Sequence, residues 1–320
     1  MDPLSHLFLL LGLDALACAR FEAGGDWAVR FPAQAHIKFG AALRGSYWLA
    51  VGDAAPVRIA AGDTYLLADC PAYVIASDCA LPAVDGVALY EAADAMTVRH
   101  GGDDIAILGG SFTFDAANAA LVMAMLPPLM VIPAGDAAAP VLRATLGLLE
   151  QELHAEMPGQ SRMGTSLMAN RLGDILLLQA LRAVADEAVP PPTSEPSDGA
   201  PAGWLGALGH AKLGKALRAM HANLRHPWQV GELATLAGMS RADFARKFKQ
   251  RVGVPPLDYL TSWRMHLARR TLHGGSASVA DAAQAAGYAS ESAFANAFKR
   301  VFGQPPSRYR AAAALAGRAL

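Results

Sequence analysis

The sequence of 320 residues is poor in cysteine and in charge, and each shortage limits what the protein can be. Three cysteines, Cys18, Cys70 and Cys79, do not make a disulfide framework, so we expect a reducing compartment. Only 17% of the residues are charged and 53% are hydrophobic, which allows a sizeable core to be buried. A chain of this length is expected to hold two domains.

A long uninterrupted apolar run is also missing. The apolar stretch from Leu7 to Leu13 follows Asp2 rather than a basic residue and lacks an obvious cleavage site, so we do not predict a signal peptide. Three prolines interrupt the apolar segment from Ala116 to Ala134, which leaves no stretch of about 18 residues for a membrane span. We expect this segment to be buried core, and the protein to be cytoplasmic without a membrane partner.

Charge of each sign is unevenly distributed, although the net charge is only -1. From His210 to Leu320 the chain has 17 Lys and Arg but 5 Asp and Glu, whereas residues 1–209 have 10 basic and 23 acidic residues. A basic domain joined to an acidic one is typical of a DNA-binding module attached to a module with another role.

The basic part contains one helical pattern twice, about fifty residues apart. In each copy a short apolar helix and a Gly precede a helix with Phe at positions i and i+4, namely Phe244 and Phe248, then Phe294 and Phe298. A Gly, two Pro and a Tyr follow at identical spacing in both copies. This pattern is typical of a helix-turn-helix, and two basic copies predict a protein that binds double-stranded DNA.

The first copy predicts a recognition helix over Arg241 to Arg251. Gly238 can take a positive φ at the turn, Ser240 can cap the helix, and the two Phe side chains anchor one face to the core. Small residues beside Arg permit close approach to the major groove, where Arg can bind guanine through two hydrogen bonds. Contact of Arg246 with a phosphate is the alternative. The predicted DNA-contacting residues of this copy are Arg241, Ala242, Ala245, Arg246 and Lys249.

In the second copy Gly287 makes the turn and Ser290 can cap the recognition helix. Asn on its exposed face can pair with adenine through two hydrogen bonds. The predicted DNA-contacting residues here are Glu291, Ser292, Ala295, Asn296 and Lys299. Between the copies, Pro256 to Leu272 predicts one helix of roughly 25 Å that would hold the two recognition helices at a fixed separation.

The segment Gly287 to Arg310 closely follows the signature of the AraC/XylS family of bacterial transcription regulators, and Trp263 to Ala268 resembles its linker helix. The resemblance covers Leu205 to Arg310. It implies seven helices with two helix-turn-helix motifs. Many members carry Arg at the position of Asn296, so this chain departs from the family there.

Residues 20–115 predict a β-rich region, because short apolar runs alternate with Gly, Asp and Pro at intervals typical of an all-β sandwich or barrel. From Pro140 the period changes to that of helices, with a second helix from Leu167 to Val184. Residues 56–67, 45–49 and 109–115 resemble the cupin-like sensor domain of a subgroup of these regulators. The resemblance implies a small β-barrel that could hold an effector, followed by helices that commonly dimerise.

The predicted fold is therefore a two-domain α+β chain. Residues 1–188 are expected to be a cupin-like effector-sensing and dimerisation domain, 189–203 a Pro-, Ser- and Gly-rich linker, and 204–320 an all-α domain with two helix-turn-helix motifs. Candidate effector-pocket residues are the aromatic and polar groups of the expected inner strands, with packing or surface roles as the alternative. They are His36, Lys38, Trp48, Tyr65 and Tyr73.

The leading hypothesis is a transcription regulator that senses a small molecule, forms a homodimer and, if it is an activator, contacts RNA polymerase. One alternative is a redox-responsive regulator that uses Cys18, Cys70 and Cys79, although buried inert thiols are commoner. The other is a metal-dependent cupin enzyme fused to a DNA-binding module. It needs a His-x-His motif and a carboxylate, whereas His36 and His100 are isolated, so we predict no catalytic residues, metal or cofactor.

Overall fold

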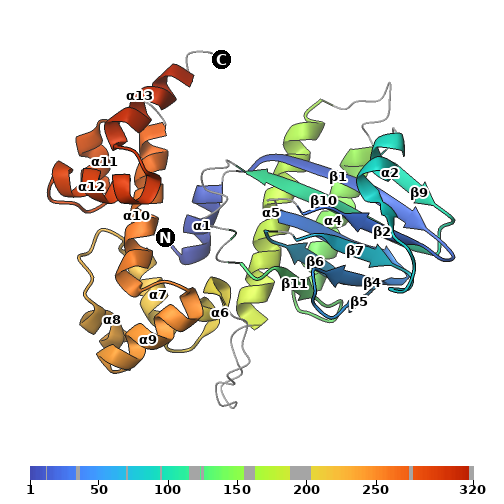
Figure 1. Ribbon diagram of the computed structural model, residues 1–320, viewed down its shortest axis with the longest axis horizontal. Coiled ribbons are helices and arrows are strands. Elements are labelled where there is room, and N and C mark those ends of the chain that lie inside the picture. The colour runs from blue at the N-terminus through green and yellow to red at the C-terminus, as the bar shows by residue number, and fades with distance from the viewer. Residues whose placement is uncertain are drawn as a thin grey trace. The chain divides into compact units, whose positions relative to one another are not determined.

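The computed structural model describes residues 1–11, 13–33, 37–69, 71–93, 96–114, 123, 126–154, 163–187, 203–273 and 277–316. The chain divides into two compact units, one of residues 11–187 and one of residues 1–10 together with 188–320 (Figure 1). We call them the β unit and the helical unit. The predicted linker lies outside the described residues except for Gly203, and the domain boundaries predicted at its two ends stay predictions.

Six strands of the β unit form its larger sheet, in the order β11-β6-β3-β10-β1-β9. All neighbouring strands are antiparallel except β1 and β9, which run parallel. The strands are β1 (Leu13–Ala23), β3 (Ile37–Arg44), β6 (Thr64–Leu67), β9 (Thr97–His100), β10 (Ile105–Phe114) and β11 (Leu129–Ile132).

Five strands form the second sheet, in the order β5-β4-β7-β2-β8, with only β2 and β8 parallel. They are β2 (Ala28–Phe31), β4 (Ser46–Val51), β5 (Val57–Ala60), β7 (Tyr73–Ala76) and β8 (Val84–Asp85). The chain passes from β3 in one sheet to β4 in the other at Gly45, whose φ of 75° suits glycine. A Cβ there would lie 2.7 Å from the carbonyl oxygen of Asp104, so the turn has no room for a side chain.

One apolar core contains side chains from both sheets, among them Phe21 and Ile107 from the larger sheet and Tyr47 and Ile75 from the smaller one. Strand β4 shows why its sequence suits this place, because Tyr47 and Leu49 are buried while Trp48 between them is 37% exposed. Among the described strands none of one sheet pairs with a strand of the other. The cupin-like β fold is therefore a two-sheet arrangement and not a closed barrel.

Three helices complete the described β unit: α2 (Gly86–Ala93), α4 (Ala139–His154) and α5 (Thr165–Glu187). Helices α4 and α5 lie against the larger sheet (Figure 1). Asn170 of α5 accepts a hydrogen bond of 3.1 Å from the backbone nitrogen of Leu16, and Glu150 of α4 pairs with Arg20 of β1. The two helices predicted after Pro140 are thus fixed to the sheet by polar contacts as well as apolar ones.

The helical unit contains nine described helices. They are α1 (Pro3–Leu11), α6 (Trp204–Gly209), α7 (Leu213–Ala222), α8 (Val230–Leu236), α9 (Arg241–Val252), α10 (Pro256–His273), α11 (Val279–Ala285), α12 (Glu291–Phe302) and α13 (Pro306–Ala316). The pairs α8–α9 and α11–α12 are the two predicted helix-turn-helix motifs. The short α6 precedes the seven helices, α7 to α13, that the family resemblance implies. The grouping of α1 with this unit was not predicted from the sequence.

Candidate DNA-binding surface and ligand cavity

The first recognition helix, α9, begins at Arg241 as the sequence predicts and ends at Val252, one residue later than predicted. The hydroxyl of Ser240 accepts a hydrogen bond of 3.2 Å from the backbone nitrogen of Asp243, which satisfies one of the free donors at the helix start. Gly253 ends the helix with a φ of 90°. Phe244 and Phe248 are fully buried, so the opposite face of α9 remains accessible.

The accessible face of α9 carries the predicted DNA-contacting residues. Arg241, Ala242, Arg246 and Lys249 are exposed, and Ala245 is half-buried. Arg246 donates a hydrogen bond of 2.6 Å to the Asp243 carboxylate, and this contact lowers the pKa of Asp243. The guanidinium is thus held on the surface by its ion pair with Asp243.

The second recognition helix, α12, repeats this construction. The hydroxyl of Ser290 accepts from the backbone nitrogen of Ala293 at 3.2 Å, and Gly303 ends the helix with a φ of 74°. Phe294 and Phe298 are fully buried. Glu291, Ser292, Asn296 and Lys299 are exposed and Ala295 is half-buried, so the accessible face is less basic than that of α9.

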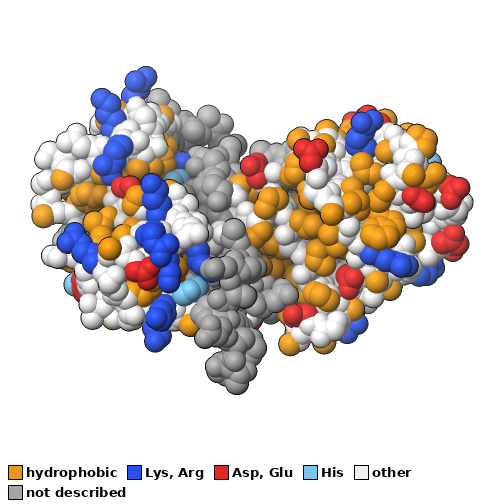
Figure 2. All heavy atoms as spheres, turned by 60° about the horizontal axis from the view of Figure 1, so that its bottom comes forward, with side chains coloured by type: hydrophobic (Ala, Val, Ile, Leu, Met, Phe, Trp, Pro, Cys, Tyr) orange, Lys and Arg blue, Asp and Glu red, His pale blue; other side chains and the backbone are white. Residues whose placement is uncertain are grey.

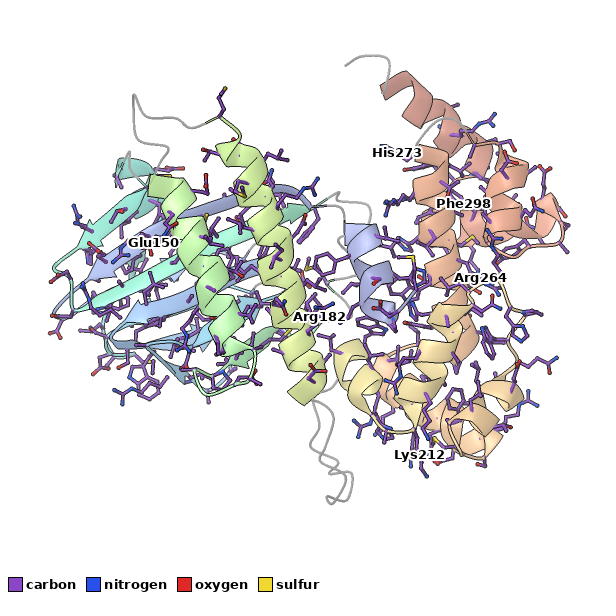
Figure 3. The ribbon with its side chains drawn as sticks, turned by 180° about the vertical axis from the view of Figure 1, so that it is seen from behind. Glu150, Arg182, Lys212, Arg264, His273 and Phe298 are labelled. Atoms are coloured by element: carbon purple, nitrogen blue, oxygen red, sulfur yellow. The ribbon has the colours of Figure 1, made fainter. Side chains whose placement is uncertain are left out.

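Helix α10 connects the two motifs and is fixed to both. Its Arg264 donates hydrogen bonds of 2.6 Å to the carbonyls of Leu224 and His226, before the first motif, and its guanidinium lies 6.0 Å from the ring centroid of Tyr288 in the second (Figure 3). Phe248 packs on Tyr259 near the start of α10. Phe298 belongs to an apolar cluster that includes residues from the second half of α10. Both motifs therefore pack against α10.

A buried polar cluster stabilises the first motif. The Trp204 indole donates to the Tyr259 hydroxyl at 2.5 Å, and Tyr259 lies 2.6 Å from Nε2 of His221. On its other side, Nδ1 of His221 lies 3.1 Å from Nδ1 of His6 on α1. Burial lowers the pKa of His221 to about 3, so the ring is neutral at pH 7 and can accept from Tyr259 while donating to His6. Helix α1 is thus part of this unit by hydrogen bonding.

Lys and Arg side chains gather on the helical unit, as the face in Figure 2 shows. The exposed basic residues of α9 and α12 lie on or beside the accessible faces of these recognition helices. Such a distribution suits a phosphate backbone, because contacts from Lys and Arg displace its condensed counterions.

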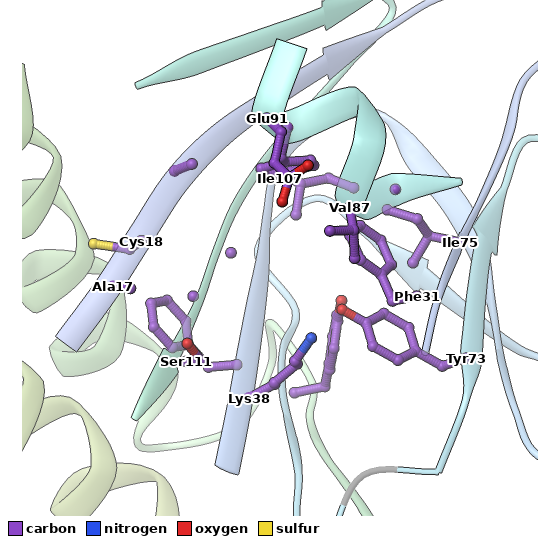
Figure 4. A pocket seen from close by; sticks show the side chains of 17 residues that line it. Ala17, Cys18, Phe31, Lys38, Tyr73, Ile75, Val87, Glu91, Ile107 and Ser111 are labelled. Atoms are coloured by element: carbon purple, nitrogen blue, oxygen red, sulfur yellow. The ribbon is translucent and has the colours of Figure 1, made fainter. Parts of the chain in front are cut away.

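The β unit contains a cavity of about 330 Å³, near the lower limit of small-molecule sites (Figure 4). Its walls come from both sheets and from α2. Predominantly apolar and aromatic side chains line it, with a few polar groups. The lining includes Cys18, Phe31, Lys38, Tyr65, Tyr73, Val87, Tyr90, Glu91 and Ser111.

Three of the five predicted pocket residues, Lys38, Tyr65 and Tyr73, line this cavity. Trp48 does not line it and is partly exposed, and His36 lies outside the described residues. Sequence reasoning missed Phe31, Tyr90 and Ser111, because the alternation that marks inner positions is short in β2 and absent from α2.

Two glycines make room for the aromatic walls. A Cβ at Gly40 would lie 2.3 Å from the Tyr65 ring, and one at Gly86 would lie 2.5 Å from the Phe31 ring. Each ring packs directly against the backbone of a glycine. A side chain at Gly40 on β3 or at Gly86 at the start of α2 would collide with the ring. The shape of the cavity therefore depends on close packing of its walls.

Of the candidate redox residues, Cys18 on β1 lines the cavity, Cys79 is exposed after β7, and Cys70 lies outside the described residues. Among the described residues, no three His, Cys, Asp or Glu side chains gather as a metal site.

Comparison with known proteins accounts for both units. The family described as Cupin matches residues 2–186, and the family described as Helix-turn-helix domain matches residues 233–312. An AraC-like transcription regulator of Streptomyces antibioticus is 38% identical over 312 residues, which is 97% of this chain and 98% of the relative. The chain belongs to the AraC family of transcription regulators.

Other transcription regulators are similar over all or part of this chain. The transcriptional regulator AlkR of Acinetobacter baylyi is 30% identical over 325 residues, covering 97% of this chain and 99% of AlkR. The crystal structure of the DNA-binding domain of AdpA in complex with a target DNA shares 34% identity, with a TM-score of 0.30, and covers 32% of this chain and 91% of that domain.

This AraC-family chain is therefore a DNA-binding transcription regulator with an N-terminal cupin domain. Its relatives are named as transcription regulators. Within the described residues, no helix combines the length and the apolar character that crossing a membrane requires.

Proposed function

We propose that the chain is a regulator in which a small molecule in the 330 Å³ cavity controls how the two recognition helices engage a promoter. The cavity in the β unit is the observation that carries this proposal, because it is lined for ligand binding and lies in a different unit from the recognition helices. A ligand shifts the DNA-binding equilibrium only by its difference in affinity between two arrangements of the chain.

On DNA, α9 and α12 would enter successive major-groove segments on one face of the duplex. Helix α10 has 18 residues and is therefore about 27 Å long. One turn of B-DNA is about 34 Å, so a closer spacing of the recognition helices would require the duplex to bend, at a cost of about 1–6 kcal/mol. Arg246 and Asn296 are the proposed base contacts, for guanine and adenine respectively.

A homodimer through α4 and α5 would place two such units on one operator. Large apolar side chains are exposed at a seven-residue spacing on each helix: Val141 and Leu148 on α4, then Met168 and Ile175 on α5. A seven-residue spacing returns to the same face of a helix, so each helix presents an apolar stripe. Leu148→Glu should shift sedimentation toward monomer, whereas Gln151→Glu, with the same charge at another exposed position of α4, should not.

The sensor proposal is tested by closing the cavity. Sequencing the DNA fragments that the purified protein retains would define an operator for a reporter. Val87→Trp on α2 should fill the cavity mouth and abolish the reporter response to an inducing growth condition, because Val87 lines the cavity and is 36% exposed. Ala88→Trp, at the exposed neighbouring position, is the matched control. Equal responses from both variants would contradict the proposal.

Cys18 on the cavity wall supports a second candidate function, a response to oxidants. A thiol in a partly open cavity can be oxidised, and the added oxygen would occupy the same space as a ligand. A variant with all three cysteines replaced by serine should lose an oxidant response but keep a small-molecule response. Operator affinity before and after oxidant treatment would distinguish the two.

A further inference from the structure

The N-terminal part of the chain contains a single lysine, and it lies in the cavity. Lys38 is the one lysine among residues 1–209, in a segment with 10 basic and 23 acidic residues. It follows the fully buried Ile37 on β3 and lines the cavity. A cation in an apolar cavity loses hydration, so its position there must be compensated by specific contacts.

Aromatic rings provide part of that compensation. The Lys38 ammonium lies 5.3 Å from the ring centroid of Phe31 and 5.2 Å from that of Tyr73. The two rings are stacked, with centroids 4.9 Å apart and planes at 17°. Figure 4 shows the Lys38 side chain pointing into the cavity toward the Tyr73 hydroxyl. The rings hold the charge at one place by cation–π attraction.

The remaining lining residues provide both polar groups and apolar wall. Tyr73 and Ser111, both labelled in Figure 4, add hydroxyl groups to the wall. Val87, Ile75 and Ile107 provide apolar wall, and Glu91, the one acidic lining residue described, is exposed on α2. One cation matches one negative charge on a ligand. The Glu91 carboxylate would repel a second negative charge.

We propose that the cavity binds a small apolar monocarboxylate, with its carboxylate at Lys38 and the Tyr73 hydroxyl and its hydrocarbon body against the aromatic and aliphatic walls. This inference rests on the proposed sensor function and names the chemical class of its ligand. A charge-assisted hydrogen bond from ammonium to carboxylate supplies the specificity, and burial of the hydrocarbon body supplies most of the affinity.

The test compares acids with their neutral isosteres on the purified full-length chain. Octanoate and phenylacetate are titrated by calorimetry beside octanamide and phenylacetamide. The acids should bind roughly tenfold to a hundredfold more tightly than the amides, because a hydrogen bond to a charged group contributes about 1.5–3 kcal/mol.

Lys38→Met keeps the unbranched stem without the charge, and should remove the preference for acids while retaining binding of the amides. Arg30→Met removes a positive charge from an exposed position of β2 beside Phe31 and should leave acid binding unchanged. If Lys38→Met does not fold, Lys38→Arg should keep the preference for acids, and the acid-to-amide ratio of the unaltered chain still decides the question.

Equal affinity for acids and amides, no binding of either acid, or an acid preference that survives Lys38→Met would overturn the monocarboxylate proposal. None of these outcomes removes the sensor proposal, which depends on the different reporter responses of Val87→Trp and Ala88→Trp. Conversely, identical responses of those two variants would overturn the sensor proposal even where octanoate binds at Lys38.

Discussion

The two helix-turn-helix motifs have the same scaffold and different accessible faces. Both recognition helices are capped by a serine, end at a glycine with positive φ and are anchored by two fully buried phenylalanines. On the accessible faces, α9 carries Arg246 paired with Asp243, whereas α12 carries Asn296 at the same position. Burial and backbone geometry restrict the scaffold positions strongly, while the accessible positions face solvent and are free to differ between the motifs.

The largest effect should come from the anchoring phenylalanines, and it should be similar in the two motifs. Phe248→Ala and Phe298→Ala each leave a cavity at a fully buried site, at an expected cost of about 3–5 kcal/mol in the free energy of unfolding. Urea denaturation of the purified chain measures this, with Lys249→Ala and Lys299→Ala as exposed controls. A large loss for only one Phe would show that the motifs differ in their cores.

The turn glycines should separate the motifs. Gly238 and Gly287 have φ values of 61° and 76°, so alanine at either costs about 1–2 kcal/mol of backbone strain. A Cβ at Gly287 would also lie 2.7 Å from the carbonyl oxygen of Arg225, whereas nothing lies within 4 Å of one at Gly238. Gly287→Ala should therefore lose a further ~1–3 kcal/mol of stability. Equal thermal midpoints for the two variants would contradict this difference.

Each motif is supported by a buried neutral histidine, which predicts a common dependence on pH. Burial lowers the pKa of His221 to about 3 and that of His266 to about 4, from 6.5. Below pH 6.5 the unfolded chain binds protons that the folded chain does not, so stability falls as pH decreases toward these values. Each histidine should contribute about 1.4 kcal/mol per pH unit.

Urea denaturation between pH 7 and pH 5 measures this dependence. His221→Asn and His266→Asn should each reduce the slope of stability against pH by one histidine's share. Identical slopes in the variants and the unaltered chain would show that neither histidine is responsible.

Helix α1 contacts His221 on α7 and Arg270 on α10, so its removal should lower the stability of the helical unit. A fragment of residues 204–320 lacks His6, the partner of His221, and the Leu9 carbonyl that accepts from Arg270. We expect this fragment to fold and bind DNA with a steep inverse salt dependence, but to be about 1–3 kcal/mol less stable than one that carries residues 1–11 fused to it. Equal stability would show that α1 contributes nothing to the unit.

The smallest effects should be those on DNA reading, and they should differ in kind between the helices. Arg246→Ala should cost about 1–3 kcal/mol in the free energy of binding to the preferred DNA site and relax the preference at one base pair. Asn296→Ala should act at another base pair. Arg246→Lys keeps the charge without the two-pronged contact, so it should also lose preference if Arg246 reads a base. Binding to a randomised operator library measures this. A uniform loss over all sequences would assign Arg246 to a phosphate.

The sequence by itself determined the two helix-turn-helix motifs. The prediction of a helix over Arg241 to Arg251 agrees with α9, which ends one residue later, and both serine caps are present. These features depend on residues three or four positions apart. Spacing of this kind determines the local cap hydrogen bonds and the periodic burial of one helix face.

The tertiary structure alone decided the cavity and the place of α1. Short strands such as β4 and β6 were located by their residues, but their order in two sheets depends on pairings between distant segments. Phe31, Lys38 and Tyr73 come together only through that order, and the contact of His6 with His221 joins residues 215 positions apart. Such contacts follow from the packing of whole elements, because no local propensity specifies which distant surface covers an apolar face.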